Sequence, residues 1–341
     1  MRILSLVIGL LAVVPLIGVS ADVSYPWVAD TFAVASCHRT GPNSEAAFAR
    51  IATGKPRVFL FLGDNIYGDT RDMQVLDKKY QALGAVAMWQ QLKAHTTVLP
   101  IWDDHDYGEN DAGIEYPMKK ESALLFFDFF GFPADHPART RGGVYHSAMF
   151  GPGGKRVQLV LLDARSFRSP LRRERVGTRK EYVPDPDAGK SMLGADQWQW
   201  LEKQLAEPAD VRMICSGIQM LPEEHAFEKW ANLPLERAKL LAVLAKTNGK
   251  LVLLSGDRHM AEISTLTREG KTFVELTTSG MTHAGGGRTS AGEEPNRHRV
   301  GKVYSDLNSG TVDITWRDGA EPSVKLRVIG ADGKEAMAHA W

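Results

Sequence analysis

The sequence predicts an α/β fold in a single domain, and two observations support that prediction. From residue 31 to about residue 257, apolar runs of strand length alternate with segments of helical spacing, the order expected of sheets covered by helices. From about residue 260 to residue 330 the alternation stops and strand-like runs follow one another. A chain of 341 residues could form one large domain or two small ones. We expect one domain over residues 22–341, with an antiparallel β section at about 260–330.

Apolar spacing and turn residues define the elements of the first half. Residues 57–62 (RVFLFL) are a continuous apolar run, which is typical of a strand buried on both faces. Residues 43–56 begin at a capping residue, keep helical spacing and stop at Gly54 and Pro56. The expected elements are a strand at 31–36, a helix at 43–56, a strand at 57–62, one or two helices within 72–95, a strand at 96–102 and a helix at 118–131.

The second half continues the alternation. Residues 142–151 and 155–163 have strand character and flank a Pro-Gly-Gly turn, which predicts a hairpin. Residues 168–190 are charged and contain Pro and Gly, so we expect a long surface loop. The further expected elements are a helix at 195–207, a strand at 211–219, a helix at 234–249, a strand at 250–257, and later strands at 261–267, 271–279, 302–316 and 323–330.

The first residues indicate an export signal. Arg2 precedes an apolar run that Pro15 interrupts, and small residues lead up to Ala21. This pattern predicts a secretory signal peptide over residues 1–21 rather than a membrane anchor, and the lack of a twin-arginine pair favours general secretion. We therefore expect a periplasmic or extracellular protein without a stable membrane anchor. Cys37 and Cys215 allow one disulfide at most.

The charge balance narrows the range of partners. Forty-one basic and forty-one acidic residues cancel, so there is no sign of a nucleic-acid-binding surface or of an anionic membrane partner. We expect a monomer that acts on a small substrate.

Polar clusters follow four of the expected strands. In α/β sheets the carboxyl ends of the strands form the ligand site, so side chains far apart in the sequence can meet there. Each cluster alone is a weak signal, but four at equivalent strand ends predict a site. The clusters are Cys37 with His38, Asp64 with Tyr67, Asp103 to Asn110, and Asp257 with His259.

These side chains are suited to holding metal ions. Carboxylates together with His, Tyr and Cys fit transition metals, with a harder ion beside them. Two neighbouring metals are a standard device for hydrolysing phosphate esters, in which a metal-bound hydroxide attacks phosphorus and a nearby His protonates the leaving group. The sequence supplies a carboxylate able to bridge two ions, terminal ligands and an acid.

Five motifs in this order make the chain resemble the alkaline phosphatase D (PhoD-like) family of metallophosphoesterases. The resemblance runs from about Phe32 to near the C-terminus and implies a four-layer α-β-β-α sandwich of two mixed sheets, with a dinuclear metal site at one end. It implies hydrolysis of phosphate monoesters, diesters or both. The motifs are FLGDNIYGDT, WDDHDYGENDAG, LLDARSFR, MLGADQWQWLEKQLAEPADVR and LSGDRH.

The resemblance also implies roles for residues of the first clusters. Asp64 matches the bridging carboxylate, and Tyr67 matches a phenolate ligand that favours Fe³⁺. Cys37 matches an iron-side ligand, although a small buried hydrophobe is the alternative interpretation. Asp104 aligns with a ligand of the second metal and His105 with the proton donor. Asp103, Asp106, Glu109 and Asp111 are left as support or surface residues.

The last cluster departs from the wider superfamily, which usually shows Gly-His-x-His. Asp257 stands where a His is expected, and His259 keeps the iron-side position. The extra carboxylate suits Ca²⁺ or another hard divalent ion at the second site. Arg165 and Asn110 are candidates for phosphate contact, with a surface salt bridge as the alternative for Arg165. Whether Gln219 or His283 joins the site is left open.

Two other functions compete with the phosphoesterase. The first is an exported, non-enzymatic calcium-binding module, because Asp104, Asp106 and Glu115 match three ligand positions of an EF-hand loop. Gly108 and Glu109 break that pattern, since a ligand position holds Gly and the glycine position holds Glu. The second is a serine hydrolase, but no G-x-S-x-G motif is present.

Overall fold

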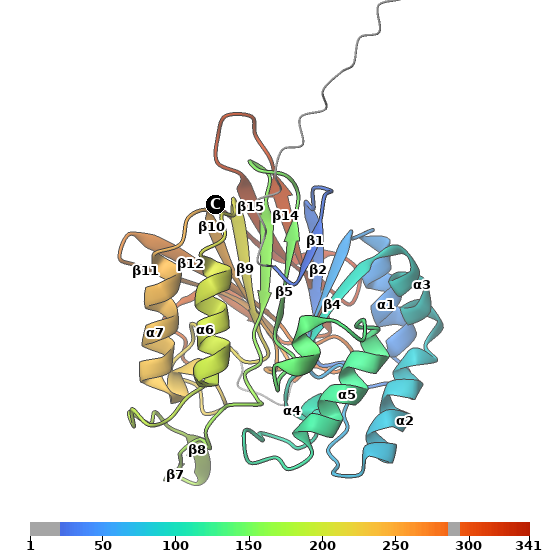
Figure 1. Ribbon diagram of the computed structural model, residues 1–341, viewed down its shortest axis with the longest axis vertical. Helices are drawn as coiled ribbons and strands as arrows, with labels where there is room; N and C mark the ends of the chain where they lie inside the picture. Colours follow the sequence, from blue (N-terminus) through green and yellow to red (C-terminus); the bar gives the residue numbers. More distant parts are fainter. Residues whose placement is uncertain (1–20, 286–293) are drawn as a thin grey trace, which may run out of the picture.

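Two β-sheets lie between two layers of helices in the computed structural model, which describes residues 21–285 and 294–341. Figure 1 shows α6 and α7 on one side of the strands and α1, α2, α3 and α5 on the other. This arrangement confirms the expected α-β-β-α sandwich of two mixed sheets. The export signal expected at residues 1–21 lies, apart from its last residue, outside the described residues. No helix in the described ranges is both long and apolar enough to cross a bilayer.

The larger sheet has eight strands, and its centre is parallel. β6, β9, β10 and β12 run parallel to one another, whereas β5 pairs with β6 and β11 pairs with β12 in the antiparallel sense. The β5–β6 pair is the hairpin that the sequence predicts. In sheet order the strands are β1 (Val23–Tyr25), β5 (His146–Phe150), β6 (Val157–Leu161), β9 (Val211–Ser216), β10 (Lys250–Ser255), β12 (Lys271–Thr278), β11 (Ala261–Arg268) and β13 (Arg299–Tyr304).

The smaller sheet has six strands. Its parallel half, β2–β3–β4, carries the first three polar clusters at its carboxyl end, and its antiparallel half comes from the C-terminus. In sheet order the strands are β16 (Glu335–Ala340), β15 (Ser323–Gly330), β14 (Asn308–Thr315), β2 (Thr31–Ala35), β3 (Val58–Leu62) and β4 (Thr97–Ile101).

The helices cover the outer faces of the sheets. α7 has Pro at its first position, where the missing backbone N–H costs nothing. The helices are α1 (Ser44–Thr53), α2 (Met73–Gly84), α3 (Ala87–His95), α4 (Asp104–Tyr107), α5 (Lys119–Phe130), α6 (Gly194–Leu205) and α7 (Pro234–Ala245), with 3₁₀ turns η1 (Pro137–Thr140) and η2 (Trp230–Asn232).

The strand period of two divides the core into layers. Along β6, Leu159 and Leu161 belong to the larger core cluster, which includes residues of both sheets, and Val160 belongs to a second cluster beneath α6 and α7. Alternate residues of one strand thus serve two cores, which is why β6 is apolar throughout. Cys215, on β9, is buried as expected, and both cysteines are free.

The structure differs from the sequence-based expectations in three places. The expected loop at 168–190 contains a two-stranded hairpin, β7 (Arg173–Val176) with β8 (Arg179–Tyr182). The strand expected at 302–316 is two strands, β13 and β14, which belong to different sheets. The antiparallel section is therefore shared between the sheets and extends to β16, beyond residue 330.

Candidate metal centre

The four polar clusters meet at one end of the sandwich. Three of them follow β2, β3 and β4, which are parallel neighbours in one sheet, and the fourth follows β10 of the other sheet. Their side chains form overlapping groups of candidate metal ligands, and within each group the ligand atoms lie within 4.8 Å of one another. The structure thus brings together all six predicted metal ligands.

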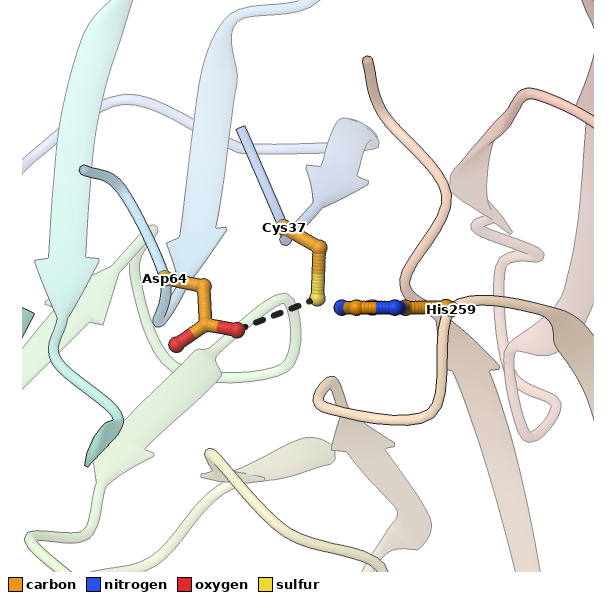
Figure 2. Close-up of side chains that lie close together, drawn as sticks. All are labelled: Cys37, Asp64 and His259. Atoms are coloured by element: carbon orange, nitrogen blue, oxygen red, sulfur yellow. Dashed lines mark hydrogen bonds between the residues drawn. The ribbon is translucent and has the colours of Figure 1, made fainter. Parts of the chain in front are cut away.

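One group combines sulfur, oxygen and nitrogen donors. Cys37, Asp64 and His259 come from three different loops and point toward one another (Figure 2). The Sγ of Cys37 lies 3.4 Å from Oδ2 of Asp64. The hydroxyl of Tyr67 lies 3.2 Å from that same oxygen and 3.1 Å from Nε2 of His259. Four donors of the types that transition metals prefer therefore surround one point.

A second group consists mainly of carboxylates. Asp103, Asp104 and Asp257 form one candidate set, and Asp64, Asp104 and His105 form another. Asp64 is the residue that belongs both to a carboxylate-rich set and to the set with Cys37 and His259. A carboxylate shared by two ligand sets is suited to the bridging role that the resemblance implies.

The buried carboxylates fit a pair of bound cations. Oδ1 of Asp64 and Oδ1 of Asp104 are buried and have no hydrogen-bond partner in the described part of the chain. Burial is the main reason why the pKa values of Asp64 and Asp257 lie well above the usual range of aspartate, and the charge of neighbouring acids adds to the shift. A buried oxygen without a hydrogen-bond partner costs free energy, and so does a carboxylate beside other negative charges. A bound metal ion would relieve both costs.

The backbone is strained at four of the six predicted ligands. Cys37, Asp64, Asp257 and His259 have φ angles of 60°, 51°, 69° and 52°. Residues other than glycine rarely adopt this left-handed region, and each such residue costs about 1–3 kcal/mol. Strain of this kind concentrates at functional sites, so it supports these loops as the active centre.

The short helix α4 holds two of the loops together. The carboxylate of Asp106 accepts hydrogen bonds from the backbone N–H of Asp103 at 2.6 Å, of Asp64 at 3.2 Å and of Asn65 at 3.1 Å. It also accepts a bond from Nδ2 of Asn65 at 2.6 Å. Gly63 has φ of 88°, and a Cβ there would lie 2.5 Å from Cβ of Asp103. The two loops therefore pack backbone to backbone.

Arg165 does not lie where a phosphate contact would place it. Its side chain is fully buried, and Nε donates to Oδ1 of Asp103 at 2.6 Å, while Nη1 donates to Oε2 of Glu228 at 2.5 Å. Nη2 lies 3.9 Å from Oδ1 of Asp104. The prediction that Arg165 contacts substrate is corrected, because its guanidinium is enclosed by carboxylates. Arg165 positions Asp103 and Asp104 instead.

Glu228 is a residue of this network that the sequence analysis missed. It is buried and also pairs with Arg168, its Oε1 lying 2.9 Å from Nη2. It belongs to an irregular segment between β9 and η2, where a charged residue has no periodic signal. The one indirect signal is that Arg165 and Arg168, once buried, need an acidic partner.

His105 is held by a carboxylate at one ring nitrogen. Nδ1 lies 2.7 Å from Oδ1 of Asp69. Burial opposes protonation, but the hydrogen bond to Asp69 and the charge of Asp104 outweigh it and raise the pKa of His105 to about 9. The imidazole is therefore protonated at neutral pH, with Nε2 left to serve a reacting group.

A cavity of about 990 Å³ opens beside these residues. Asp104, His105, Asp257 and His259 line it, and so does Asn110. Asn110, a predicted substrate contact, is thus placed where a substrate could reach it.

Two residues left open by the sequence lie in different surroundings. The ring of His283 lies 4.4 Å from that of His259 and 4.8 Å from that of Tyr67, centroid to centroid. Gln219 is fully buried, and its Nε2 donates to Glu262 at 2.7 Å and to Thr277 at 2.9 Å. His283 therefore adjoins the centre, whereas Gln219 belongs to a separate buried network.

A sandwich of two mixed sheets with clustered metal ligands at the strand ends is the architecture of a metal-dependent phosphoesterase. The chain belongs to the PhoD-like phosphatase family, whose model matches residues 32–319. The protein is thus a phosphoesterase hydrolase of the metal-dependent kind, as its motifs predict. A comparison with curated protein sequences finds no significant match.

Solved structures share the fold at low sequence identity. The chain is similar to the structure of PhoD, with a TM-score of 0.69 and 18% identity over 93% of this chain and 69% of that one. It is similar to GAP50, the anchor in the inner membrane complex of Plasmodium, with a TM-score of 0.58 and 11% identity over 92% of this chain and 88% of that one. It is also similar to a dimetal phosphatase from Danio rerio, with a TM-score of 0.53 and 15% identity over 92% of this chain and 98% of that one. At these identities the similarity shows the fold alone.

Proposed function

We propose that this protein is an exported enzyme that uses two different metal ions to hydrolyse phosphate monoesters, diesters or both. The observation that carries the proposal is that Asp64 belongs to both ligand groups: its Oδ2 contacts Cys37 and Tyr67, and its buried Oδ1 has no hydrogen-bond partner among the described residues. A site of this kind suits a metal pair, which when bound supplies Lewis-acid activation of water and of the phosphoryl oxygens.

The donors differ in hardness, and this difference supports two kinds of ion. Cys37, Tyr67 and His259, with Asp64, would hold Fe³⁺, because thiolate, phenolate and imidazole suit a transition metal. Asp104 and Asp257, with the second oxygen of Asp64, would hold Ca²⁺ or another hard divalent ion, because oxygen ligands suit such ions. Both metal identities are part of the proposal.

His105 acts as the general acid in this proposal. Asp69 fixes the proton of Nδ1, so that Nε2 presents its own proton to the leaving-group oxygen. Asn110, at the rim of the cavity, would donate a hydrogen bond to the substrate phosphate. The balanced net charge supports a small substrate rather than a nucleic acid, and we propose that the enzyme acts as a monomer.

Metal analysis of the purified protein, together with two substrates, tests the proposal. We expect one iron and one divalent ion per chain, a visible ferric–tyrosinate absorption band, and release of nitrophenol from 4-nitrophenyl phosphate, bis(4-nitrophenyl) phosphate or both. Tyr67→Phe keeps the ring but removes the phenolate, so the band should vanish. A colourless, iron-free and fully active enzyme would refute the iron assignment. A fully metallated protein that is inactive on both substrates would refute the proposed function.

A further inference from the structure

The β7–β8 hairpin reaches the same cavity as the candidate metal ligands. Arg173, Arg179 and Lys180 of the hairpin line the cavity together with Asp104 and Asp257, and Glu181 is the acidic residue of the hairpin that lines it. In Figure 1 the hairpin projects at the lower edge of the molecule, beyond α6 and α7. Its two strands pair in register from Arg173 opposite Tyr182 to Val176 opposite Arg179. The cavity therefore extends from the metal ligands to a separate element with a different composition.

The hairpin is fixed to the metal centre through Tyr182. The hydroxyl of Tyr182 donates to Oδ2 of Asp111 at 2.7 Å, and the backbone N–H of Asp111 donates to Oδ2 of Asp104 at 2.7 Å. The backbone N–H of Tyr182 donates to the carbonyl of Ala226 at 2.9 Å. The guanidinium of Arg173 lies over the Tyr182 ring, 4.6 Å from its centroid. The base of the hairpin is thus held at a defined position relative to Asp104.

Three cations of the hairpin face the cavity without a carboxylate partner. No acidic group in residues 21–285 or 294–341 lies within ion-pair distance of Arg173, Arg179 or Lys180. Arg258, by contrast, also lines the cavity but pairs with Glu294 at 2.7 Å. Arg172, the residue before β7, pairs with Glu174. Unpaired cations around a concave site attract anions, and arginine is suited to phosphate oxygens.

We propose that Arg173, Arg179 and Lys180 form a second anion subsite, so that the substrate bears another phosphate group besides the one that is hydrolysed. This inference rests on the proposed function, because it needs the reacting phosphate to bind at the metal ligands. The acidic floor of the cavity would hold the metal ions and the reacting phosphate, and the basic hairpin would hold the second phosphate. The hairpin then determines which phosphate esters are preferred.

Two substrates that differ by one phosphate test the subsite. Thymidine 5′-(4-nitrophenyl phosphate) and its 3′-phosphorylated counterpart both release nitrophenolate when water adds across the same P–O bond. We expect kcat/KM to be at least about tenfold higher for the 3′-phosphorylated substrate, the gain expected of charge-assisted hydrogen bonds. The preference should fall as salt rises, since the hairpin cations are exposed and screened.

A matched pair of double variants locates the effect. Arg179→Gln with Lys180→Gln removes two cavity-lining charges, and the preference should fall to below about threefold. Arg172→Gln with Arg175→Gln removes one charge just before β7 and one within β7, neither of which lines the cavity, and it should keep the preference. Equal rates on both substrates in the wild type, or an unchanged preference in the first double variant, would overturn the subsite.

A binding measurement separates this inference from the proposed function. Calorimetry on the metal-loaded His105→Ala variant, in which turnover is suppressed, compares thymidine 3′,5′-bisphosphate with thymidine 5′-phosphate. We expect the bisphosphate to bind at least about tenfold more tightly, and Arg179→Gln with Lys180→Gln to abolish that difference. An enzyme inactive on every ester that still shows this difference would refute the proposed function and support the subsite. Equal affinities would overturn the subsite whatever the activity.

Discussion

Two carboxylates of the centre differ in charge because their neighbours differ. Burial alone would raise the pKa of Asp104, but the charges of Arg165 and His105 outweigh it and lower the pKa to about 2. Asp64 is equally buried and has acids as its main neighbours, so its pKa is raised well above the usual range. Asp104 is therefore ionised before any metal binds, whereas Asp64 depends on a cation to become so.

His105→Ala tests whether His105 is a proton donor or a metal ligand. If His105 is the general acid, we expect turnover to fall by about 10²–10⁴-fold, while the metal content stays close to that of the wild type. Asp64→Ala should lose both metals, because Asp64 joins the two ligand groups. Turnover and bound metal are measured on the same preparations. Loss of metal from His105→Ala would make His105 a ligand instead.

Asp69→Asn tests how the protonated state of His105 is maintained. The pKa of His105 is raised to about 9 in part by Asp69, and a general acid works only while protonated. Wild-type activity should therefore decline above about pH 9. Removing the carboxylate should move that decline toward the ordinary imidazole value of about 6.5.

The control for this pH profile is Asp77→Asn, an exposed carboxylate on α2 that contacts Gln81. We expect its profile of kcat/KM against pH to match that of the wild type. An alkaline limb that stays in place in Asp69→Asn would show that another group sets it.

At the scale of elements, the helix α4 matters out of proportion to its four residues. Asp106 within it accepts four hydrogen bonds from Asp64, Asn65 and Asp103, and Asp103 in turn holds Arg165. The sequence letters DHDY contain no apolar period, so no helix could be predicted there. β3, with every residue buried, could be predicted because burial on both faces requires a continuous apolar run.

Asp106→Ala should destabilise the fold strongly. It leaves the buried backbone N–H groups of Asp64, Asn65 and Asp103 without an acceptor and removes one of the two acceptors of the Asn65 side-chain amide, so we expect the free energy of unfolding to fall by about 3 kcal/mol or more. Asp72→Ala is the matched control, because Asp72 caps α2 with a single bond to the N–H of Gln74 at 2.9 Å, and its loss should cost about 1 kcal/mol. Urea unfolding measures both variants. Equal losses would contradict the bracing role of Asp106.

The hairpin β7–β8 shows why some elements escape sequence analysis. All four residues of β7 are exposed, so no alternation of apolar and polar residues marks the strand. The two-residue turn at Gly177 and Thr178 is a hairpin signal, but the charged flanks conceal it. The strand ends, by contrast, could be located, because buried strands and the polar residues after them are both visible in the sequence.

At the scale of the whole molecule, the sequence leaves the assignment of strands to sheets open. Residues 302–316 look like one strand, yet the chain crosses from the larger sheet at Tyr304 to the smaller sheet at Asn308. Pairing between strands depends on partners far away in the chain, and β14 pairs with β2 from the opposite end of the sequence. Local patterns do not encode such partners, whereas the convergence of the clusters follows from strand direction alone.

The metal centre draws its candidate ligands from both sheets, so metal removal should weaken the whole sandwich. Cys37, Asp64 and Asp104 follow strands of the smaller sheet, and Asp257 and His259 follow β10 of the larger one. An ion that binds only the folded state at a hundredfold excess over its Kd adds about 2.7 kcal/mol. For a chain of this size, that energy raises Tm by about 4 °C.

Calorimetry with and without a chelator measures this stabilisation, and Asp64→Asn is the informative variant. In metal-free buffer we expect its Tm to equal or exceed that of the metal-free wild type, because the raised pKa makes Asp64 take up a proton on folding, a cost that Asn does not carry. Added metal should then raise its Tm by less than it raises that of the wild type, because the residue that joins the two ligand groups is impaired. If the chelator leaves the wild-type Tm unchanged, or if both proteins respond equally to metal, the ions do not join the two sheets through Asp64.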